Sequence, residues 1–193
     1  MTVQNFSKKK SQTLELIKIA AQNNISLIQI REKKIFARQV FELARKAVEI
    51  TRITGTKILV NDRADIALAA FADGVHLTSR SLCADTIRRA FPENFIIGAS
   101  AHTIEEAVNL KRQGAGFVTF SPIFSTPNKG EPQGIETLRK VCEKLKPFPV
   151  IALGGIDETN YKSVLKSGAS GFAAIRFLND AENIRKLSTV KHK

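Results

Sequence analysis

Short apolar runs alternate with amphipathic stretches along nearly the whole chain. The runs are rich in β-branched residues and mostly lack polar–apolar alternation, which is the pattern of strands buried on both faces. Between them, apolar residues recur at helical spacing, as in the expected helix 37–53 with Val40, Leu43, Ala44, Ala47 and Val48 on one face. The expected strands are Ser26–Ile30, Lys57–Val60, Gly74–Leu77, Phe95–Ala99, Gly116–Phe120, Val150–Leu153 and Gly171–Ile175.

This order of elements predicts a single α/β domain over residues 1–193. Each strand–helix unit takes about 20 to 30 residues, which favours a (β/α)8 TIM barrel over the alternative, a doubly wound sheet. Seven strands are found instead of eight, and a helix from about Ser11 to Asn23 follows the start of the chain almost directly. The first strand is therefore expected to be missing or reduced to Thr2–Phe6, either through a truncated start or as a real departure.

The composition is that of an ordinary globular protein, with 43% hydrophobic and 25% charged residues. The longest apolar runs, such as residues 65–72, are far shorter than the roughly 20 residues of a membrane span, so no membrane partner is expected. Cys83 and Cys142 have no metal-like spacing. They are typical of two free thiols in a reducing cytoplasm.

The net charge of +12 raises the question of nucleic-acid binding. The basic residues are scattered through the expected helices, with one short run at Lys8, Lys9 and Lys10. There is no RNA-binding or helix-turn-helix signature. These observations argue against nucleic acid and indicate a solvated basic surface, together with an anionic small-molecule substrate.

Polar residues follow the strands at the end where a barrel has its working face. Gln29, Arg31 and Lys33 have the same parity at the end of the second barrel strand, so their side chains are expected to converge. A planar Arg fork with a Lys point charge suits a diphosphate. The other interpretation is a solvated charged turn.

Two further strand ends carry candidate chemistry. The strand 57–60 ends in Asn61 and Asp62, whose oxygens suit Mg²⁺, although Asp62 or Asp65 could instead cap the next helix. Ser100 and His102 follow the strand 95–99 with equal parity. His102 is a candidate proton-transfer group, or a structural histidine at a helix start.

The longest loop, Ser121 to Gly134, contains three prolines and two glycines, as ordered binding loops and lids often do. Its Lys129 is placed to reach an anion. Gly154 and Gly155 follow the next strand and would let backbone N–H groups face a phosphate. Arg176 adds a cation after the last strand. Taken together, the strand ends predict a site for phosphorylated ligands.

With these residues the chain resembles the family of thiamine phosphate synthases and the closely related thiazole tautomerases. The likeness extends from about Leu27 to Phe177 and rests on six motifs in order: "QIREK", "NDRADIALA", "DGVHL", "IGASAHT", "SPIFSTPNKG" and "IALGGI". It implies a barrel that couples a hydroxymethylpyrimidine diphosphate to a hydroxyethylthiazole phosphate. Thiamine phosphate and pyrophosphate would be the products, with Mg²⁺ assisting.

The resemblance also implies roles for the strand-end residues. Ser100 and Lys129 would grip the leaving pyrophosphate, Asp62 would bind Mg²⁺, and Thr126 with the Gly155 backbone would take the thiazole phosphate. The pyrimidine diphosphate would be held by Gln29, Arg31, Lys33 and Asn61. The whole predicted substrate-binding set is Gln29, Arg31, Lys33, Asn61, Ser100, Thr126, Asn128, Lys129, Gly154, Gly155 and Arg176, and the predicted catalytic residues are Ser100, His102 and Lys129.

Three positions depart from the family pattern. Ser81 stands where the synthases usually carry the Asp that is their second Mg²⁺ ligand, so a weakened Mg²⁺ site is expected. Asn128 replaces the second Thr of a "T-x-T-K" run. Arg176 replaces a small hydroxyl residue, where it could compensate as a phosphate-binding cation.

These departures leave two other functions open. A metal-independent thiazole tautomerase would use His102 to move a proton on a thiazole carboxylate phosphate, and its family resembles the "SRS" stretch 79–81 more closely. A non-catalytic ligand-binding paralogue would fit the missing first strand. That missing strand would also leave a sheet edge that invites a homo-oligomer. The complete pyrophosphate-gripping set favours the synthase.

Overall fold

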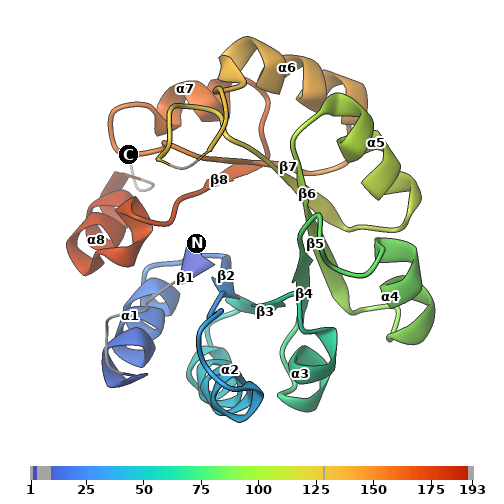
Figure 1. Ribbon diagram of the computed structural model, residues 1–193. Helices are drawn as coiled ribbons and strands as arrows, with labels where there is room; N and C mark the ends of the chain where they lie inside the picture. Colours follow the sequence, from blue (N-terminus) through green and yellow to red (C-terminus); the bar gives the residue numbers. More distant parts are fainter. Residues whose placement is uncertain (1, 4–9, 128, 191–193) are drawn as a thin grey trace. The chain divides into compact units, whose positions relative to one another are not determined.

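The computed structural model describes residues 2–3, 10–127 and 129–190. Their contacts divide the chain into two compact units, residues 1–75 together with 175–193, and residues 76–174. Strands and helices alternate along the described residues, as the sequence predicts (Figure 1). The organisation of all 193 residues as one domain remains a prediction.

In the described part of the first unit, the strands β1 (Thr2–Val3), β2 (Leu27–Ile30) and β3 (Lys57–Asn61) pair in parallel. Helix α1 packs against both α2 and α8 (Figure 1). The helical elements are α1 (Lys10–Gln22), α2 (Ala37–Thr51), α3 (Ala64–Ala69), the 3₁₀ turn η1 (Phe177–Asn179) and α8 (Ala181–Val190). In the described residues β1 covers only Thr2–Val3, within the reduced strand Thr2–Phe6 that the sequence predicts.

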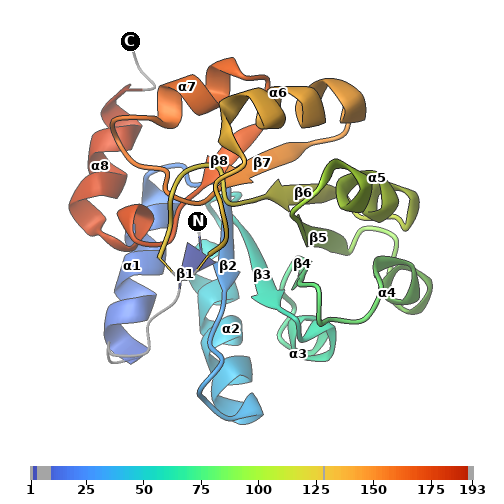
Figure 2. The ribbon, with the colours of Figure 1, turned by 45° about the horizontal axis from the view of Figure 1, so that its top comes forward.

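The second unit continues the same pattern. The boundary between the units falls within strand β4 (Gly74–Leu77), whose first two residues belong to the first unit and whose last two belong to the second. Helices α5 and α6 lie side by side (Figure 2). The parallel strands are β5 (Ile96–Ala101), β6 (Phe117–Phe120), β7 (Val150–Leu153) and β8 (Gly171–Ala173), and the helices are α4 (Ala84–Ala90), α5 (Ile104–Arg112), α6 (Gly134–Leu145) and α7 (Tyr161–Lys166).

Helix α2 shows how the pattern produces the structure. Its buried face carries Val40, Leu43, Ala44 and Ala47, as helical spacing predicts. The helix ends at Thr51, two residues before the predicted end. Thr54 Oγ1 donates to the carbonyl of Thr51 at 2.9 Å, and Gly55 follows with φ of 73°. These two features turn the chain out of the helix.

The core of the second unit lies between its strands and α6. All four residues of β6 are buried, and α6 contributes Leu138, Val141, Cys142 and Leu145. Full burial of a side chain of this size contributes roughly 1.5–3 kcal/mol. Burial also raises the pKa of the Cys142 thiol to about 11. Cys142 and the exposed Cys83 are both free thiols, as predicted.

The last strand ends earlier than predicted. β8 stops at Ala173 instead of Ile175. Arg176 has helical backbone angles, φ −64° and ψ −48°, and is the N-cap of η1. Asn179 N–H donates to the carbonyl of Ile175 at 3.0 Å. The side chain of Arg176 therefore projects from the start of a helical turn instead of from a strand end.

None of the helices within the described ranges combines the length and the apolar character needed to cross a bilayer.

Candidate active site

Gln29 and Asn61 are joined at the ends of β2 and β3. Gln29 Nε2 donates to Asn61 Oδ1 at 3.0 Å, and Gln29 is only 7% exposed. The strand register places Gln29 opposite Leu59, so Asn61, two residues further on, points to the same face. Because Oδ1 accepts this bond, the Nδ2 group of Asn61 can donate to a ligand. An anionic oxygen is a suitable acceptor for it.

Asp62 directly follows β3 in a left-handed conformation with φ of 65°. Arg63 N–H donates to the carbonyl of Asn61 at 2.8 Å and closes a three-residue turn around Asp62. Such backbone is strained for a residue other than glycine and is concentrated at functional positions. The N-cap of α3 is Arg63, so Asp62 does not cap that helix.

Asp65 does not take the N-cap position either. It lies in the first turn of α3 and pairs with Arg63 at 2.6 Å between Oδ2 and Nη2. The hydrogen bond from Arg63 holds the pKa of the Asp65 carboxyl below its usual range. The two acidic residues therefore differ in their surroundings. Asp65 forms an ion pair with Arg63, whereas Asp62 lies at the centre of a strained turn directly after β3.

The predicted cations of the first unit lie beyond the strands. β2 ends at Ile30, so the alternation used to align Gln29 with Arg31 and Lys33 does not extend to the two cations. Arg31 is half-buried, and this burial lowers the pKa of its guanidinium. Lys33 and Arg176 are exposed. A partly desolvated guanidinium gains more from an anionic partner than a solvated one does.

In the second unit, Thr78 and Ser81 close a tight turn after β4. Ser81 N–H donates to the carbonyl of Thr78 at 3.0 Å, and Ser81 Oγ accepts from Thr78 N–H at 2.8 Å and contacts Thr78 Oγ1 at 3.2 Å. The Ser81 hydroxyl is thus used to hold the turn. A pocket of about 200 Å³ lies beside this turn and is also lined by Ser100 and by Glu106 and Asn109 of α5.

His102 fastens the exit of β5 to the exit of β6. Its Nδ1 lies 2.7 Å from the carbonyl oxygen of Ser121, and its backbone N–H donates to Glu106 Oε2 at 2.6 Å. A carbonyl oxygen only accepts, so Nδ1 carries a proton. In the neutral ring Nε2 then has the lone pair and is the atom that can accept a proton.

Ser100 belongs to a set of linked polar side chains. Thr119 Oγ1 lies 3.5 Å from Ser100 Oγ and 3.2 Å from His76 Nε2. His76 and Thr119 are 4% and 5% exposed. Reasoning from strand ends missed both residues because they lie within strands. The available signal was a polar residue inside each of the apolar runs "GVHL" and "FVTF".

The paired glycines after β7 allow the long loop to approach closely. Ile123 N–H and Phe124 N–H donate to the carbonyls of Leu153 and Gly154, each at 3.0 Å. Gly154 and Gly155 have φ of 104° and 67°, and a Cβ on Gly155 would lie 2.7 Å from Phe124 Cβ. Only glycine combines this backbone with this packing.

The same contacts orient two backbone N–H groups. The carbonyl of Gly154 faces the Phe124 amide, so Gly155 N–H, on the opposite side of that trans peptide, points away from the loop. Asn160 Nδ2 donates to the carbonyl of Gly155 at 2.9 Å, so Ile156 N–H, on the opposite side of that trans peptide, points away from Asn160. Asn160 Oδ1 accepts from Asp157 N–H at 3.1 Å. Successive N–H groups turned outward in this way suit an anion. Asn160 was also missed by the sequence reasoning.

The loop itself carries the remaining predicted residues. Thr126 Oγ1 donates to the carbonyl of Phe124 at 3.1 Å, and Lys129 N–H donates to the carbonyl of Thr126 at 3.2 Å. The Lys129 side chain is exposed. Asn128 lies outside the described residues.

Comparison with known proteins agrees with these features. The family model described as "Thiamine monophosphate synthase" matches residues 2–178. The chain belongs to the thiamine monophosphate synthase family. It is 38% identical to the thiamine-phosphate synthase of Caldanaerobacter subterraneus subsp. tengcongensis over 171 residues, which is 87% of this chain and 79% of that protein. It is 40% identical to a putative thiamine-phosphate synthase 2 of Aquifex aeolicus over 164 residues, 84% of this chain and 87% of that protein.

A solved structure of the family supports the fold. The thiamine phosphate pyrophosphorylase from Pyrococcus furiosus matches with a TM-score of 0.85 and 30% identity, over 98% of this chain and 94% of the other. The fold is TIM-like (β/α), as predicted, and its first strand spans Thr2–Val3 in the described residues. These three relatives are named as synthases or a pyrophosphorylase, which favours a synthase over a tautomerase or a non-catalytic paralogue.

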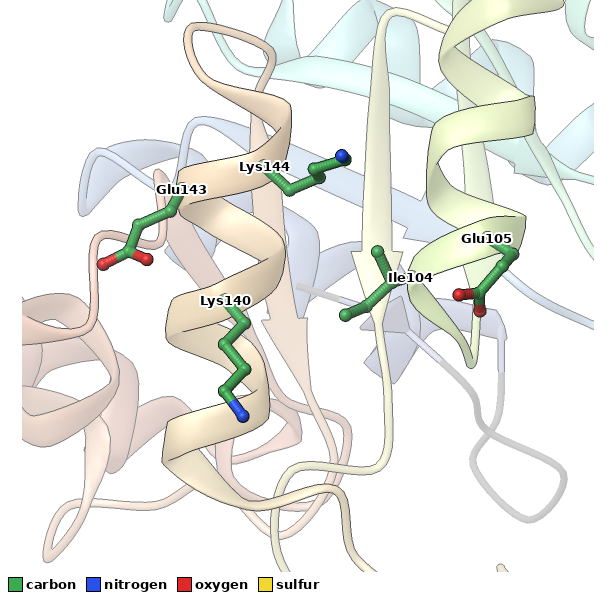
Figure 3. Close-up of a pocket in the computed structure, with 5 residues that line it drawn as sticks. All are labelled: Ile104, Glu105, Lys140, Glu143 and Lys144. Atoms are coloured by element: carbon green, nitrogen blue, oxygen red, sulfur yellow. The ribbon is translucent and has the colours of Figure 1, made fainter.

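A second surface feature of the second unit is separate from the family residues. A groove of about 590 Å³ runs between α5 and α6 (Figure 3). It is lined by Ile104, Glu105, Lys140, Glu143 and Lys144. None of these residues belongs to the predicted site, and their charges are of both signs. The strand ends are therefore the better candidate for the active site.

Proposed function

We propose that this protein is a thiamine-phosphate synthase. It couples hydroxymethylpyrimidine diphosphate to hydroxyethylthiazole phosphate and releases pyrophosphate. The observation that carries the proposal is the family match over residues 2–178, a range that includes every strand-end residue named above.

The pyrimidine diphosphate is held by residues of the first unit. Asn61 offers its Nδ2 group because its Oδ1 is taken by Gln29, and the half-buried Arg31 with Lys33 neutralises phosphate oxygens. Ser100 and Lys129 of the second unit hold the leaving pyrophosphate. Its negative charge increases as the bond breaks, so cations and hydroxyl donors at this position stabilise the transition state more than the ground state.

The thiazole phosphate is bound mainly by backbone. The outward N–H groups of Gly155 and Ile156 support this role, together with Gly154, whose φ of 104° shapes the turn. Thr126, Asn128 and Arg176 complete the set. Arg176 supplies a charge where the family usually has a small hydroxyl residue.

Mg²⁺ is the implied metal, and the residues present fit a weak site. In the described ranges no three His, Cys, Asp or Glu side chains are grouped closely enough to hold a metal, and Asp62 is the carboxylate displayed at a strand end. Mg²⁺ commonly binds through one or two carboxylates plus substrate phosphates. When bound, the ion would neutralise diphosphate oxygens, with Asp62 as its protein ligand and Ser81 contributing no charge.

The reaction requires positioning more than covalent chemistry. The bond between the pyrimidine methylene carbon and the diphosphate oxygen breaks, and both electrons leave with the oxygen. The thiazole nitrogen then forms a bond to the methylene carbon. Residues that hold the two substrates in line convert an encounter in solution into a step within one complex, while Ser100 and Lys129 stabilise the departing charge.

The experiment is a coupled incubation of purified protein with both substrates and MgCl₂, with thiamine phosphate measured by chromatography. Product is expected only when both substrates are present, and Lys129→Ala should reduce the rate by about 10²-fold or more. Lys140→Ala, in the groove between α5 and α6, is the matched control and should leave the rate unchanged. A folded protein that forms no product would contradict the proposal.

A cytoplasmic location, the absence of a nucleic-acid partner and a homo-oligomeric state remain predictions.

A further inference from the structure

Three polar side chains on successive strands of the second unit are linked to one another. His76 is on β4, Ser100 on β5 and Thr119 on β6. His76 Nε2 lies 3.2 Å from Thr119 Oγ1, which lies 3.5 Å from Ser100 Oγ. His76 and Thr119 are almost fully buried, while Ser100 is partly exposed. The set therefore has a buried end and an accessible end.

We propose that His76 and Thr119 are positioning residues that direct the Ser100 hydroxyl proton toward an anionic ligand. The proposal deepens the proposed function and rests on it at one point, the contact of Ser100 with the leaving pyrophosphate. His76 and Thr119 act through Ser100 and are not assigned contacts of their own with the substrate.

The direction of the hydrogen bonds depends on which ring nitrogen of His76 carries a proton. The Thr119 hydroxyl has one proton. If His76 Nε2 carries a proton, it donates to Thr119, Thr119 donates to Ser100, and the Ser100 proton remains available. With a bare Nε2, Thr119 would donate to His76, and its oxygen could then accept the Ser100 proton. Thr119 would in that case compete with a phosphate oxygen for the Ser100 proton instead of leaving it available.

Apolar packing surrounds the buried end of this set. The ring of Phe117 lies 6.2 Å from that of His76, centroid to centroid. Gly98 makes room for it, because a Cβ there would lie 2.3 Å from Phe117 Cζ. In an apolar environment a hydrogen bond is stronger than in water, and linked bonds polarise one another. An ordinary apolar core would not need a histidine and a threonine at these two positions.

The contact between Thr119 and Ser100 is long for a hydrogen bond between hydroxyls, whose usual distance is about 2.7–2.8 Å. Catalytic hydrogen bonds are often long before the substrate binds and become shorter in the complex. We therefore expect the two residues to be coupled most strongly when an anion is bound at Ser100.

The test measures binding of inorganic pyrophosphate, in the presence of MgCl₂, by isothermal titration calorimetry. Thr119→Val removes the hydroxyl at nearly constant volume and should raise Kd about 5- to 10-fold, the effect of losing one hydrogen bond between neutral groups. Thr119→Ser keeps the hydroxyl and should stay within about twofold. His76→Gln retains a donor near the Nε2 position and should be milder than His76→Leu.

The decisive variant is Thr119→Val in a Ser100→Ala background. If Thr119 acts only through Ser100, the double variant should bind pyrophosphate no more weakly than Ser100→Ala alone. Thr56→Val is the matched control, because Thr56 is 5% exposed and its hydroxyl donates to the carbonyl of Ile25 at 2.8 Å. That variant should lose stability and keep its pyrophosphate affinity.

A long-range ¹H–¹⁵N NMR spectrum adds a direct readout, with the His76 signals assigned by their loss in His76→Gln. A protonated Nε2 is expected. A bare Nε2, additive effects of Thr119→Val and Ser100→Ala, or a wild-type protein that does not bind pyrophosphate would each overturn the proposal. The product assay decides separately on the synthase function, because an inactive protein that binds pyrophosphate through Ser100 would contradict only that function.

Discussion

The strand ends of the two units are held in different ways. In the first unit the bond joins two side chains, from Gln29 Nε2 to Asn61 Oδ1 at 3.0 Å. In the second unit, the segments that follow β5 and β7 are held by bonds from side chains to the main chain. His102 Nδ1 bonds to the carbonyl of Ser121 at 2.7 Å, and Asn160 Nδ2 bonds to the carbonyl of Gly155 at 2.9 Å.

This difference teaches where each unit is vulnerable. A bond between two side chains depends on the chemical groups at both positions and is lost when either is replaced. A main-chain segment held by hydrogen bonds needs room around it and particular backbone angles. A larger side chain at such a segment therefore disrupts it even when no functional group is changed. The first unit should therefore respond most to altered polarity and the second to altered size.

Gly155→Ala should have the largest effect. The left-handed backbone costs about 1–2 kcal/mol for alanine, and overpacking against Phe124 adds about 1–3 kcal/mol. Thermal unfolding should show Tm lowered by about 5–15 °C, and the product assay should show loss of synthase activity.

Gly55→Ala separates the cost of the left-handed backbone from the cost of overpacking. Gly55 has φ of 73°, and no atom lies within 4 Å of the point that a Cβ would occupy there. The variant should therefore lose only about 1–2 kcal/mol and keep its activity. Equal Tm values for Gly55→Ala and Gly155→Ala would show that packing against the loop is not the sensitive feature of the second unit.

Asn61→Leu should have the next largest effect. It removes the acceptor of the buried Gln29 amide, which costs about 1–3 kcal/mol, and it should raise KM for the pyrimidine diphosphate. Denaturant unfolding of Gln29→Leu, Asn61→Leu and the double variant forms a mutant cycle. The double variant should lose less stability than the sum of the single losses. Strict additivity would mean that the bond between the two side chains contributes nothing.

Ser81→Asp should change metal dependence with little change in stability. One oxygen of the new carboxylate can accept the Thr78 N–H that Ser81 Oγ accepts at 2.8 Å, and the other is then available to Mg²⁺. The Mg²⁺ concentration for half-maximal rate should fall at least about tenfold, an effect that even outer-shell ligands reach. Ser79→Asp adds the same charge two residues away and should not reproduce it. An equal response in both variants would indicate general electrostatics.

Arg63→Ala should have the smallest effect, because its partner Asp65 is on the surface. Exposed pairs contribute about 0–1 kcal/mol. The pKa of Asp65 is lowered in the folded protein, so its contribution is present above the unfolded pKa of about 3.9 and is lost as pH falls through the folded value. Urea unfolding at pH 7 and pH 3 should show the difference between wild type and variant shrinking at low pH.

Arg88→Ala gives the corresponding measurement in the second unit. Arg88 donates to the carbonyls of Gly114 and Glu93, the latter at 2.9 Å, so its loss should cost more than that of Arg63, with no comparable decline at low pH. A cost smaller than that of Arg63→Ala would break the contrast between the two units.

Much of the fold was readable because its signals are local. Apolar runs predicted β4 and β7 with the bounds that the structure has, and helical spacing identified the buried face of α2. Ends were less predictable. Arg176 was assigned to the end of a strand, but it is the N-cap of the 3₁₀ turn η1, because backbone angles there depend on contacts that the local sequence does not reveal.

The site was readable where the side chain itself makes the contact. Gln29 and Asn61 could be selected as polar residues at strand ends, and the structure brings them together. Asn160, His76 and Thr119 were not selected. Asn160 acts on a carbonyl within its own turn, and the other two are embedded in apolar strands, where a polar residue also occurs as a satisfied core group.

The sequence by itself determined the succession of strands and helices, the family and the residues available at the strand ends. Those properties depend on spacing and residue type, which are visible along the chain. Only the tertiary structure showed that position 155 requires glycine, because a side chain there would collide with Phe124. It also showed that the Ser81 hydroxyl holds a turn and that Ser100 is linked to a buried histidine. All three features depend on distances of a few ångströms between atoms. The roles of Ser81 and Ser100 depend in addition on which atoms their hydrogen bonds join.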